Sequence, residues 1–265
     1  MPRILLLAAA LLAVTAGDPE GNYDPPVDRK VVDLGPAETS PDQHVELRCH
    51  YYRGFMVKEV DERELGAATL AIVPASKGFP SCQRAELPGE IVITPEVWPG
   101  YFAGVSGRYV IFRSYDGANG AMAFAVFPAA GKTPLYTAAT SGPLRFDISP
   151  SGRSMLRFDK TFDASCSVPR DGAACIQAVA RATGAPPVAA ELCATGYEAA
   201  KRMHARWTCD DEKDTSERCF ATQIKAFAYY DTLPSVVAVP TEVTLLAGSG
   251  QEQVLGAPRA CWPQD

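Results

Sequence analysis

The sequence has few of the residues and motifs on which most recognisable enzyme chemistry depends. It contains three histidines, and no pair of them has the spacing of a zinc-binding H-E-x-x-H motif. These are His44, His50 and His204. Basic residues are not in excess, since 31 Asp and Glu residues outnumber 25 Lys and Arg residues and give a net charge of −6. An acidic chain repels phosphate backbones, so we expect no nucleic-acid partner.

Two short segments resemble parts of catalytic motifs, but each lacks a required residue. Residues 130–133 (Ala-Gly-Lys-Thr) resemble the end of a phosphate-binding loop, but Val126 occupies a position where that loop requires glycine. Residues 104–107 (Gly-Val-Ser-Gly) resemble part of a nucleophile elbow, but Arg108 occupies the position of its last glycine. The sequence therefore favours neither an ATP-dependent enzyme nor a serine hydrolase of this kind, and we expect no cofactor.

Carboxylates are concentrated at residues 59–64 and 210–217. Acidic loops of this kind can bind calcium. A calcium loop beginning at Asp210 needs glycine at its sixth position and a carboxylate at its twelfth, where this chain has Thr215 and Ala221. We therefore expect solvated loop tips and no metal. Two carboxylates that converge from distant parts of the chain would suffice for a glycosidase, so a hydrolase stays an alternative.

Long apolar runs are absent except near the N-terminus, at residues 4–14. Arg3 precedes this run, and residues 14–16 (Val-Thr-Ala) supply the small residues that signal peptidase requires before Gly17. As a helix the run rises only about 16 Å, against roughly 30 Å for a membrane core, so it is too short for an anchor. We predict a signal peptide over 1–16, cleaved after Ala16, no stable membrane anchor, and a periplasmic or extracellular location. The scarcity of asparagine and abundance of alanine indicate a bacterial chain, so the periplasm is preferred.

Eight cysteines are present, and none forms the close C-x2-C pair that zinc sites use. An even number in an exported chain predicts disulfides. Two pairs are expected across short loops, one of them the acidic loop at 210–218 and the other a Pro-Arg-Asp-Gly turn, and two pairs follow by elimination. In that order the pairs are Cys209–Cys219, Cys166–Cys175, Cys49–Cys82 and Cys193–Cys261.

After the signal peptide, residues 17–43 are polar and rich in Pro and Gly, which predicts an extended or mobile arm before one β-rich domain over 44–265. Apolar and polar residues alternate over 45–51, the period of a half-buried strand. Gly54 interrupts this pattern, and we expect it to form a bulge before a second strand, over 55–60. A third strand is expected over 67–73, with a helix over 60–70 as the competing interpretation.

The middle third of the chain contains short apolar segments separated by turn residues at intervals of roughly 8–12 residues, which is typical of antiparallel sandwiches, barrels and propeller-like sheets. Residues 107–140 resemble one propeller blade, but the pattern does not recur, so a full propeller is not predicted. The six expected strands are 101–105, 108–115, 121–127, 134–138, 144–148 and 154–158.

Beyond Cys166 the pattern changes to that of a small helical insertion at about 171–206. Asp171 suits the start of a helix over 173–182, and a second helix is expected over 197–206. Strands at 224–230 and 236–239 then precede a final hairpin made of 242–246 and 253–255. The expected fold is mainly β with this insertion, and an α+β fold is the alternative.

Aromatic residues occur in clusters in or near the expected strands. Neighbouring residues of a strand point to opposite faces, so one ring of each adjacent pair must leave the core unless both sheet faces are covered. These rings are therefore candidates for a partner or ligand surface. They are Tyr51, Tyr52, Trp98, Tyr101, Phe102, Tyr229 and Tyr230.

The sequence contains eight cysteines suited to disulfides but no recognisable arrangement of catalytic residues. The favoured hypothesis is an exported, non-enzymatic β-rich binding or interaction module whose partner is an unknown protein or small ligand of the cell envelope. One alternative is a secreted hydrolase with an unrecognised site, built from carboxylates or from one of the histidines. The other is a protein inhibitor that presents a stapled loop such as 210–218.

Overall fold

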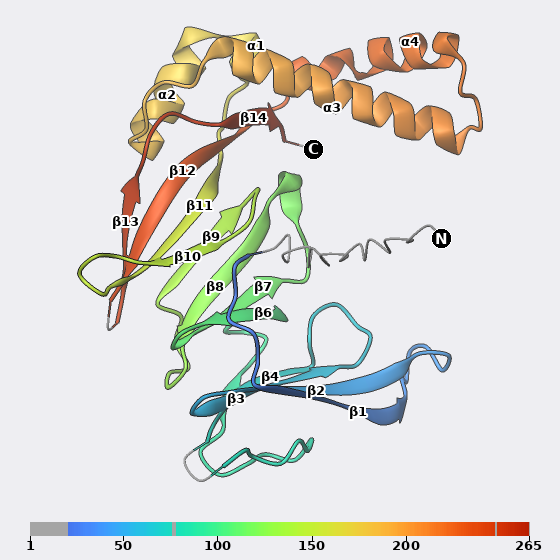
Figure 1. Ribbon diagram of the computed structural model, residues 1–265. Helices are drawn as coiled ribbons and strands as arrows, with labels where there is room; N and C mark the ends of the chain where they lie inside the picture. The colour runs from blue at the N-terminus through green and yellow to red at the C-terminus, as the bar shows by residue number, and fades with distance from the viewer. Residues whose placement is uncertain (1–20, 76–77, 247, 265) are drawn as a thin grey trace, which may run out of the picture.

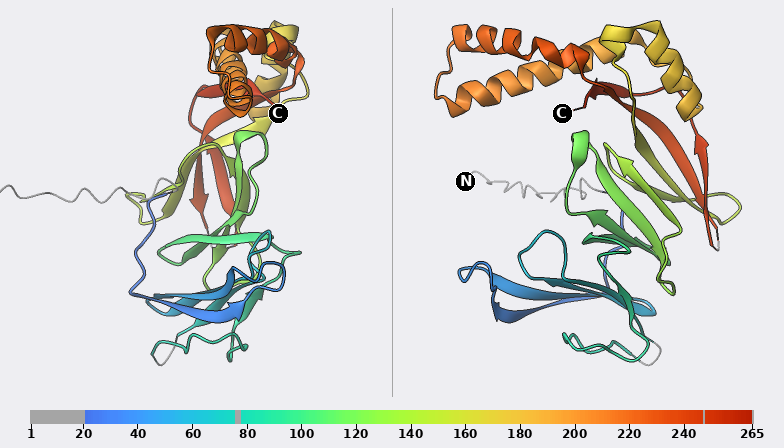
Figure 2. Two further views of the ribbon diagram at one scale, coloured as in Figure 1. Left: turned by 90° about the vertical axis from the view of Figure 1, so that its right-hand side faces the viewer. Right: turned by 180° about the vertical axis from the view of Figure 1, so that it is seen from behind.

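The computed structural model describes residues 21–75, 78–246 and 248–264, and these form two antiparallel sheets and a group of helices (Figure 1). The predicted signal peptide, residues 1–16, lies outside the described residues. The helices lie at one end of the molecule, the nine-stranded sheet lies in the middle, and the five-stranded sheet lies at the other end (Figure 2). The prediction of a mainly β fold is confirmed.

The five-stranded sheet is a meander in which each strand pairs with the next along the chain. Burial alternates along its second strand, as the sequence predicts, and the third expected strand forms in place of the competing helix. Gly54 is not a bulge, because Arg53 and Gly54 form the two-residue turn of a hairpin, where the positive φ of 89° suits glycine. The strands are β1 (Asp28–Pro36), β2 (His44–Tyr52), β3 (Phe55–Asp61), β4 (Thr69–Pro74) and β5 (Ile91–Ile93).

The nine-stranded sheet has the order β13-β12-β11-β9-β8-β7-β6, with β10 also paired to β11 and β14 to β12. All six strands predicted in the middle third are present, as is the final hairpin. The strands are β6 (Gly100–Ser106), β7 (Tyr109–Ser114), β8 (Met122–Pro128), β9 (Tyr136–Thr140), β10 (Arg145–Ile148), β11 (Ser154–Asp163), β12 (Ser235–Leu245), β13 (Gly250–Val254) and β14 (Ala260–Pro263).

The two halves of this larger sheet meet where a single registered pair, Lys160 with Thr140, joins β11 to β9. Side chains from β7 and β8 on one side of that joint and from β10, β11 and β12 on the other pack in one buried cluster. Phe124 and Phe158 meet there with ring centroids 5.0 Å apart. The two halves of the sheet therefore enclose a shared core rather than lying flat.

The helical insertion is longer than predicted and runs from residue 168 to 232. The helix expected over 173–182 is confirmed, and the one expected over 197–206 is the middle of a longer helix. The strand predicted over 224–230 is wrong: this segment is helical, and Phe227 and Tyr230, three residues apart, lie together against His204. The elements are α1 (Val168–Asp171), α2 (Ala173–Thr183), α3 (Ala190–Asp211), α4 (Glu217–Ala226) and the 3-10 helix η2 (Phe227–Thr232).

The N-terminal strap, residues 21–27, is extended and connects parts of the fold that are distant in sequence. The amide of Asn22 forms two hydrogen bonds with the backbone of Phe146 in β10. The backbone NH of Asp24 donates to Val105 in β6. The backbone NH of Val27 donates to Tyr51 in β2, and β1 follows. The described part of the predicted polar arm is thus extended and hydrogen-bonded to both sheets.

Four disulfides form, in the same four pairs that the sequence analysis names: Cys49–Cys82, Cys166–Cys175, Cys193–Cys261 and Cys209–Cys219. The first fixes the loop after β4 to the five-stranded sheet, and the other three lie in or next to the helical insertion. Four disulfides suggest an oxidising location outside the cytoplasm.

Candidate functional site

The clearest projecting feature of the molecule is a helical arm, residues 197–232, made of most of α3 together with α4 and η2. Figures 1 and 2 show the far end of α3 and the whole of α4 extending beyond the sheet that the other helices cover. Every residue of its tip, 210–218, is exposed.

The arm forms because α3 has a narrow buried stripe. Its buried residues recur every four positions, which places them on one face of the helix. Ser216 caps α4, since its hydroxyl accepts a hydrogen bond from the NH of Cys219 at 3.1 Å. The tip turn is closed by the NH of Asp214, which donates to the carbonyl of Cys209 at 2.9 Å. The stripe consists of Cys193, Tyr197, Lys201, Ala205 and Cys209.

The root of the arm is fixed to the nine-stranded sheet by a covalent bond and by close backbone contact. Cys193 of α3 is bonded to Cys261 of β14. One turn away, a Cβ on Gly196 would lie 1.8 Å from the carbonyl oxygen of Cys261, so only glycine permits this approach. The hydroxyl of Tyr197 contacts Leu233 and Ser235 at 2.9 and 2.8 Å. The arm is therefore rigidly attached.

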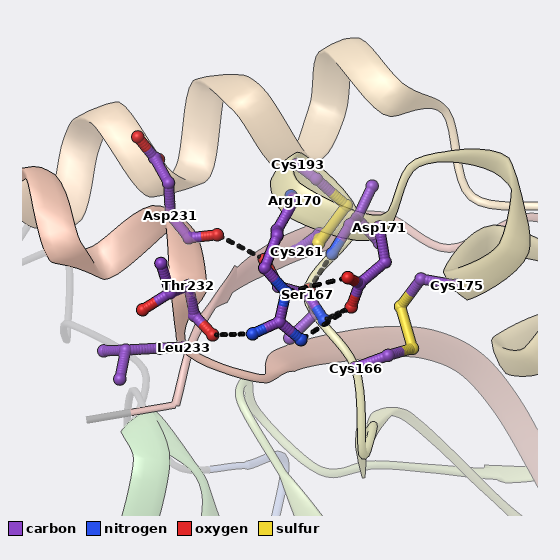
Figure 3. Close-up of a disulfide and its surroundings, with 12 residues drawn as sticks. Cys166, Ser167, Arg170, Asp171, Cys175, Cys193, Asp231, Thr232, Leu233 and Cys261 are labelled. Carbon is purple, nitrogen blue, oxygen red and sulfur yellow. Dashed lines mark hydrogen bonds and ion pairs between the residues drawn. A yellow bond between two sulfur atoms is a disulfide. The ribbon is translucent and has the colours of Figure 1, made fainter.

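A polar network ties α1 to the end of η2 beside the Cys166–Cys175 bond (Figure 3). The hydroxyl of Ser167 donates to the carbonyl of Asp231 at 2.6 Å, and Arg170 donates to the carbonyl of Thr232 at 3.1 Å. Two hydrogen bonds from Arg170, with one from the NH of Ser167, hold the pKa of Asp171 at about 2. The chain segments that enter and leave the arm are thus joined at its root.

Lys201 is the one buried cation of the stripe, with a side chain 7% exposed. Its ammonium group lies 2.7 Å from Asp231 of η2 and 2.9 Å from Glu198. Burial alone would lower the pKa of Lys201, but the hydrogen bonds that its ammonium group donates to these two carboxylates outweigh burial and raise that pKa. The charged lysine therefore links α3 to η2 along the length of the arm.

An aromatic patch lies on the arm around His204 and consists of Trp207, Phe227 and Tyr229, and Met203 precedes Trp207 by one turn on the same face of α3. Trp207 is 57% exposed, Tyr229 53% and Met203 43%. His204 lies beneath them, with its ring centroid 5.1 Å from that of Trp207 and 5.8 Å from that of Phe227. The Nδ1 atom of His204 is 2.6 Å from the hydroxyl of the buried Tyr230. The exposed rings thus rest on an ordered layer.

The tip of the arm is acidic and is stapled by Cys209–Cys219. Asp210 and Asp211 follow Trp207 by three and four positions, so the start of the tip lies on the same side of the helix as Trp207. Two basic residues, Lys213 and Arg218, accompany the carboxylates. The acidic side chains are Asp210, Asp211, Glu212, Asp214 and Glu217.

Of the aromatic residues predicted as a surface, Tyr229 lies in the aromatic patch and Tyr230 lies buried beneath it. Tyr51 and Tyr52 are both buried, because both faces of the five-stranded sheet are covered: Tyr51 packs with the loop that contains Cys82, and Tyr52 with the nine-stranded sheet. The sequence analysis missed Met203 and Trp207, whose four-residue spacing in a helix was the available signal.

Trp98, Tyr101 and Phe102 are partly buried and hold the two sheets together. The hydroxyl of Tyr101 donates to the carbonyl of Glu64 at 2.9 Å, and the indole NH of Trp98 donates to the carbonyl of Arg113 at 3.3 Å. Phe102 has its ring centroid 4.8 Å from that of His50. These rings therefore contribute to packing within and between the sheets.

A cleft of about 510 Å³ lies between the sheets and is bordered by the N-terminal strap. His50, Glu59 and Asp24 are among its lining residues. Burial, together with the charges of Arg29 and Arg48, lowers the pKa of His50 to about 4, which keeps this ring neutral at physiological pH.

Both carboxylate oxygens of Glu59 are occupied in this cleft. One accepts a hydrogen bond from Arg48 at 2.9 Å and the other from the NH of Phe102 at 2.7 Å. Burial raises the pKa of Glu59, although those two contacts act against it. The geometry suits a brace between β3 and β6 better than a proton-transferring group. Of the described residues, no group of three or more His, Cys, Asp or Glu is arranged to hold a metal ion.

Comparison with protein-family models, with curated proteins and with solved structures finds no match for this chain. Within the described ranges, no helix has both the length and the apolar character needed to cross a membrane.

Proposed function

We propose that this chain is an exported, periplasmic bacterial protein that binds a protein partner through the helical arm. The observation that carries the proposal is the aromatic patch, in which Trp207 and Tyr229 are each more than half exposed on a fixed support. Trp and Tyr are the residues that most often dominate binding energy at protein interfaces. Rings already held by neighbouring rings lose little conformational entropy when a partner covers them.

The charge of the tip supports a particular kind of partner. Five carboxylates against two basic side chains give residues 210–218 a negative character next to the aromatic patch. A complementary partner carries an apolar pocket flanked by Lys or Arg. Such charge complementarity speeds association and disfavours partners of the wrong charge. The electrostatic attraction weakens as the salt concentration rises.

Site-specific photo-crosslinking tests the proposal. A photoreactive phenylalanine at position 207 or 229 is expected to capture the same partner in the native envelope. The matched control is position 148, where Ile148 is 68% exposed on β10, away from the arm. Equal capture at all three positions would contradict the proposal.

Affinity measurements with the captured partner sharpen the test. Trp207→Ala is expected to weaken binding about 30-fold, the effect of a loss of about 2 kcal/mol at a hot spot. Replacing Asp210 and Asp211 by Lys is expected to slow association and reduce its salt dependence. Ile148→Ala is expected to leave both quantities unchanged. Unchanged affinity in Trp207→Ala would count against the arm as the interface.

An inhibitor is the second candidate, and the stapled, projecting tip favours it. An inhibitor needs a rigid loop that reaches into an enzyme, and Cys209–Cys219 fixes such a loop here. Replacing both cysteines by serine separates the two candidates, because the aromatic patch is retained while the tip loosens. Loss of inhibition of a captured enzyme, with binding retained, would indicate an inhibitor.

A further inference from the structure

The cleft between the two sheets is a second candidate binding site, separate from the helical arm, with a volume of about 510 Å³. Packed protein interiors leave few voids larger than a water molecule, and small-molecule sites begin at roughly 300 Å³. One wall is the face of the five-stranded sheet that is turned toward the nine-stranded sheet. The other wall consists of β6 and the N-terminal strap. The space is therefore large enough for a small molecule.

Strand register explains why polar side chains converge on the first wall. Arg48, His50 and Tyr52 alternate along β2, so they share one face of the sheet. Arg29 of β1 is registered opposite His50, and Glu59 of β3 is registered opposite Arg48. Directly opposite residues of neighbouring strands lie on the same face. The five-stranded sheet therefore presents a group of hydrogen-bonding side chains to the cleft.

His50 and Tyr52 have hydrogen-bonding groups that the protein itself does not use. No described residue forms a hydrogen bond with the ring nitrogens of His50 or with the hydroxyl of Tyr52. Tyr52 is only 6% exposed, yet its hydroxyl is not enclosed, so this hydroxyl opens onto the cleft. Buried polar side chains in native proteins are nearly always paired. Two unpaired groups, two residues apart on one strand, therefore indicate a place for a ligand.

Both groups are in a protonation state that suits a neutral partner. The pKa of about 4 keeps His50 neutral at physiological pH, so its ring offers one donor and one acceptor. Burial, and then the charge of Asp24, raises the pKa of Tyr52 to about 12, so its hydroxyl keeps its proton and can donate. The cleft therefore supplies uncharged donors and acceptors together.

The charges that border the cleft without a partner are of both signs. Arg29 and Asp24 each lack an ion-pair partner among the described residues. One carboxylate oxygen of Asp24 accepts a hydrogen bond from the NH of Gly107 at 2.6 Å, which leaves the other oxygen for a ligand. A ligand of single charge would be attracted by one of these side chains and repelled by the other. A neutral hydroxyl can donate to Asp24 or accept from Arg29 without that conflict.

An apolar surface completes the cleft. The ring of Phe102 in β6 lies with its centroid 4.8 Å from that of His50 and 6.5 Å from that of Tyr52. Pro25 and Pro26 of the N-terminal strap also line the space. Ligand sites commonly combine such aromatic and apolar walls with a few placed polar groups. A sugar ring has the matching character, because its C–H face is apolar and its edge carries hydroxyls.

We propose that this cleft binds a neutral saccharide of one or two rings. Sugar hydroxyls both donate and accept hydrogen bonds, which matches the mixed set of unpartnered side chains in the cleft. At roughly 30 Å³ for a water-sized group, the volume suits about 17 non-hydrogen atoms, which lies between a monosaccharide and a disaccharide. None of these side chains belongs to the helical arm, so either proposal can fail without the other.

An NMR titration of the purified protein, with its disulfides intact, tests the class of ligand. The neutral probes are glucose, galactose, mannose, N-acetylglucosamine, maltose, lactose and cellobiose. At least one is expected to cause saturable shifts of the Phe102 amide and the His50 ring. The amino and uronate derivatives of the sugar that binds are expected to bind more weakly, because each carries a single charge. No saturable shift with any neutral probe, or equal affinity for the charged derivatives, would overturn the proposal.

Two variants with the same chemical change locate the site. Tyr52→Phe removes only the unpaired hydroxyl and is expected to weaken binding of that sugar about tenfold, the effect of one lost hydrogen bond. Tyr51→Phe is the matched control, because Tyr51 points to the opposite face of β2, where its ring lies 5.0 Å from that of Phe79. Thermal unfolding establishes that both variants fold. Unchanged affinity in Tyr52→Phe, or equal loss in both variants, would refute the assignment.

Discussion

Lys58 is a charged side chain in the middle of β3 with only 1% of its surface exposed. Its ammonium group lies 2.5 Å from Glu90, which is equally buried, and close to the carbonyls of Arg84 and Ala85. With the Cys49–Cys82 bond, this pair fixes the loop between β4 and β5 to the sheet. A buried pair of this kind is tolerated only while both partners are present.

Lys58→Met is expected to destabilise the protein by about 3–5 kcal/mol, because it leaves the Glu90 carboxylate buried without its cation. Urea denaturation measures the loss. The double variant Lys58→Met with Glu90→Leu removes both charges and is expected to recover most of that stability. A single variant as stable as the original protein would show that the pair does not matter.

His50 offers a prediction about pH. Its pKa of about 4 lies below the ordinary 6.5 because burial, and then Arg29 and Arg48, disfavour the charged ring. The unfolded chain takes up this proton below about pH 6.5 but the folded chain only near pH 4, so stability is expected to fall as pH decreases across that window. An NMR titration of the His50 ring, assigned with His50→Gln, is expected to have its midpoint near pH 4. A midpoint near 6.5 would contradict the buried placement.

At the scale of elements, α1 and η2 are joined by the Ser167–Arg170–Asp171 network at the root of the arm. Asp171 has its pKa lowered from 3.8 to about 2, first by the hydrogen bonds from Arg170 and then by that from Ser167. A lowered carboxyl pKa stabilises the fold above about pH 4, and that contribution disappears as pH falls toward 2.

Asp171→Asn is therefore expected to lower the melting temperature at pH 7 while having little effect near pH 2. Thermal unfolding followed by circular dichroism at both pH values measures the difference. Asp163→Asn provides the control, since Asp163 lies at the end of β11, outside this network. A pH-independent effect of Asp171→Asn would argue against the ionised carboxylate as its cause.

At the scale of the whole molecule, Glu59 and a shared apolar cluster are among the contacts that join the two sheets. That cluster includes Val57 and Ile72 from the five-stranded sheet and Phe112 and Phe127 from the other. Glu59 adds a hydrogen bond from β3 to the NH of Phe102 in β6. Without it that NH would lose its partner in a partly buried position.

Glu59→Ala is expected to cost about 1–3 kcal/mol, because it leaves the NH of Phe102 unsatisfied while Arg48 keeps Glu46 and Asp61 as partners. Hydrogen exchange of the Phe102 amide is expected to accelerate more than tenfold. Glu46→Ala removes a different partner of Arg48 and is expected to leave that amide unchanged. Equal acceleration in both variants would show that the brace acts only through Arg48.

Local chemistry was sufficient to predict much of this architecture. Period-two burial over 45–51, turn residues between the middle strands, and cysteines on either side of short loops led to the strands and disulfide pairs that the structure contains. Local pattern failed at 224–230, where the packing of Phe227 and Tyr230 against His204 decides the conformation. That contact joins residues more than twenty positions apart, so no local period records it.

The sequence by itself determined that the chain is mainly β and rich in disulfides, because strand periodicity and cysteine number are local or compositional properties. Only the tertiary structure decided which side chains are exposed. Tyr51 and Tyr52 are covered from both faces, whereas Met203 and Trp207 stay open because their part of α3 extends past the sheet. Exposure depends on what packs against an element, and that is fixed by distant parts of the chain.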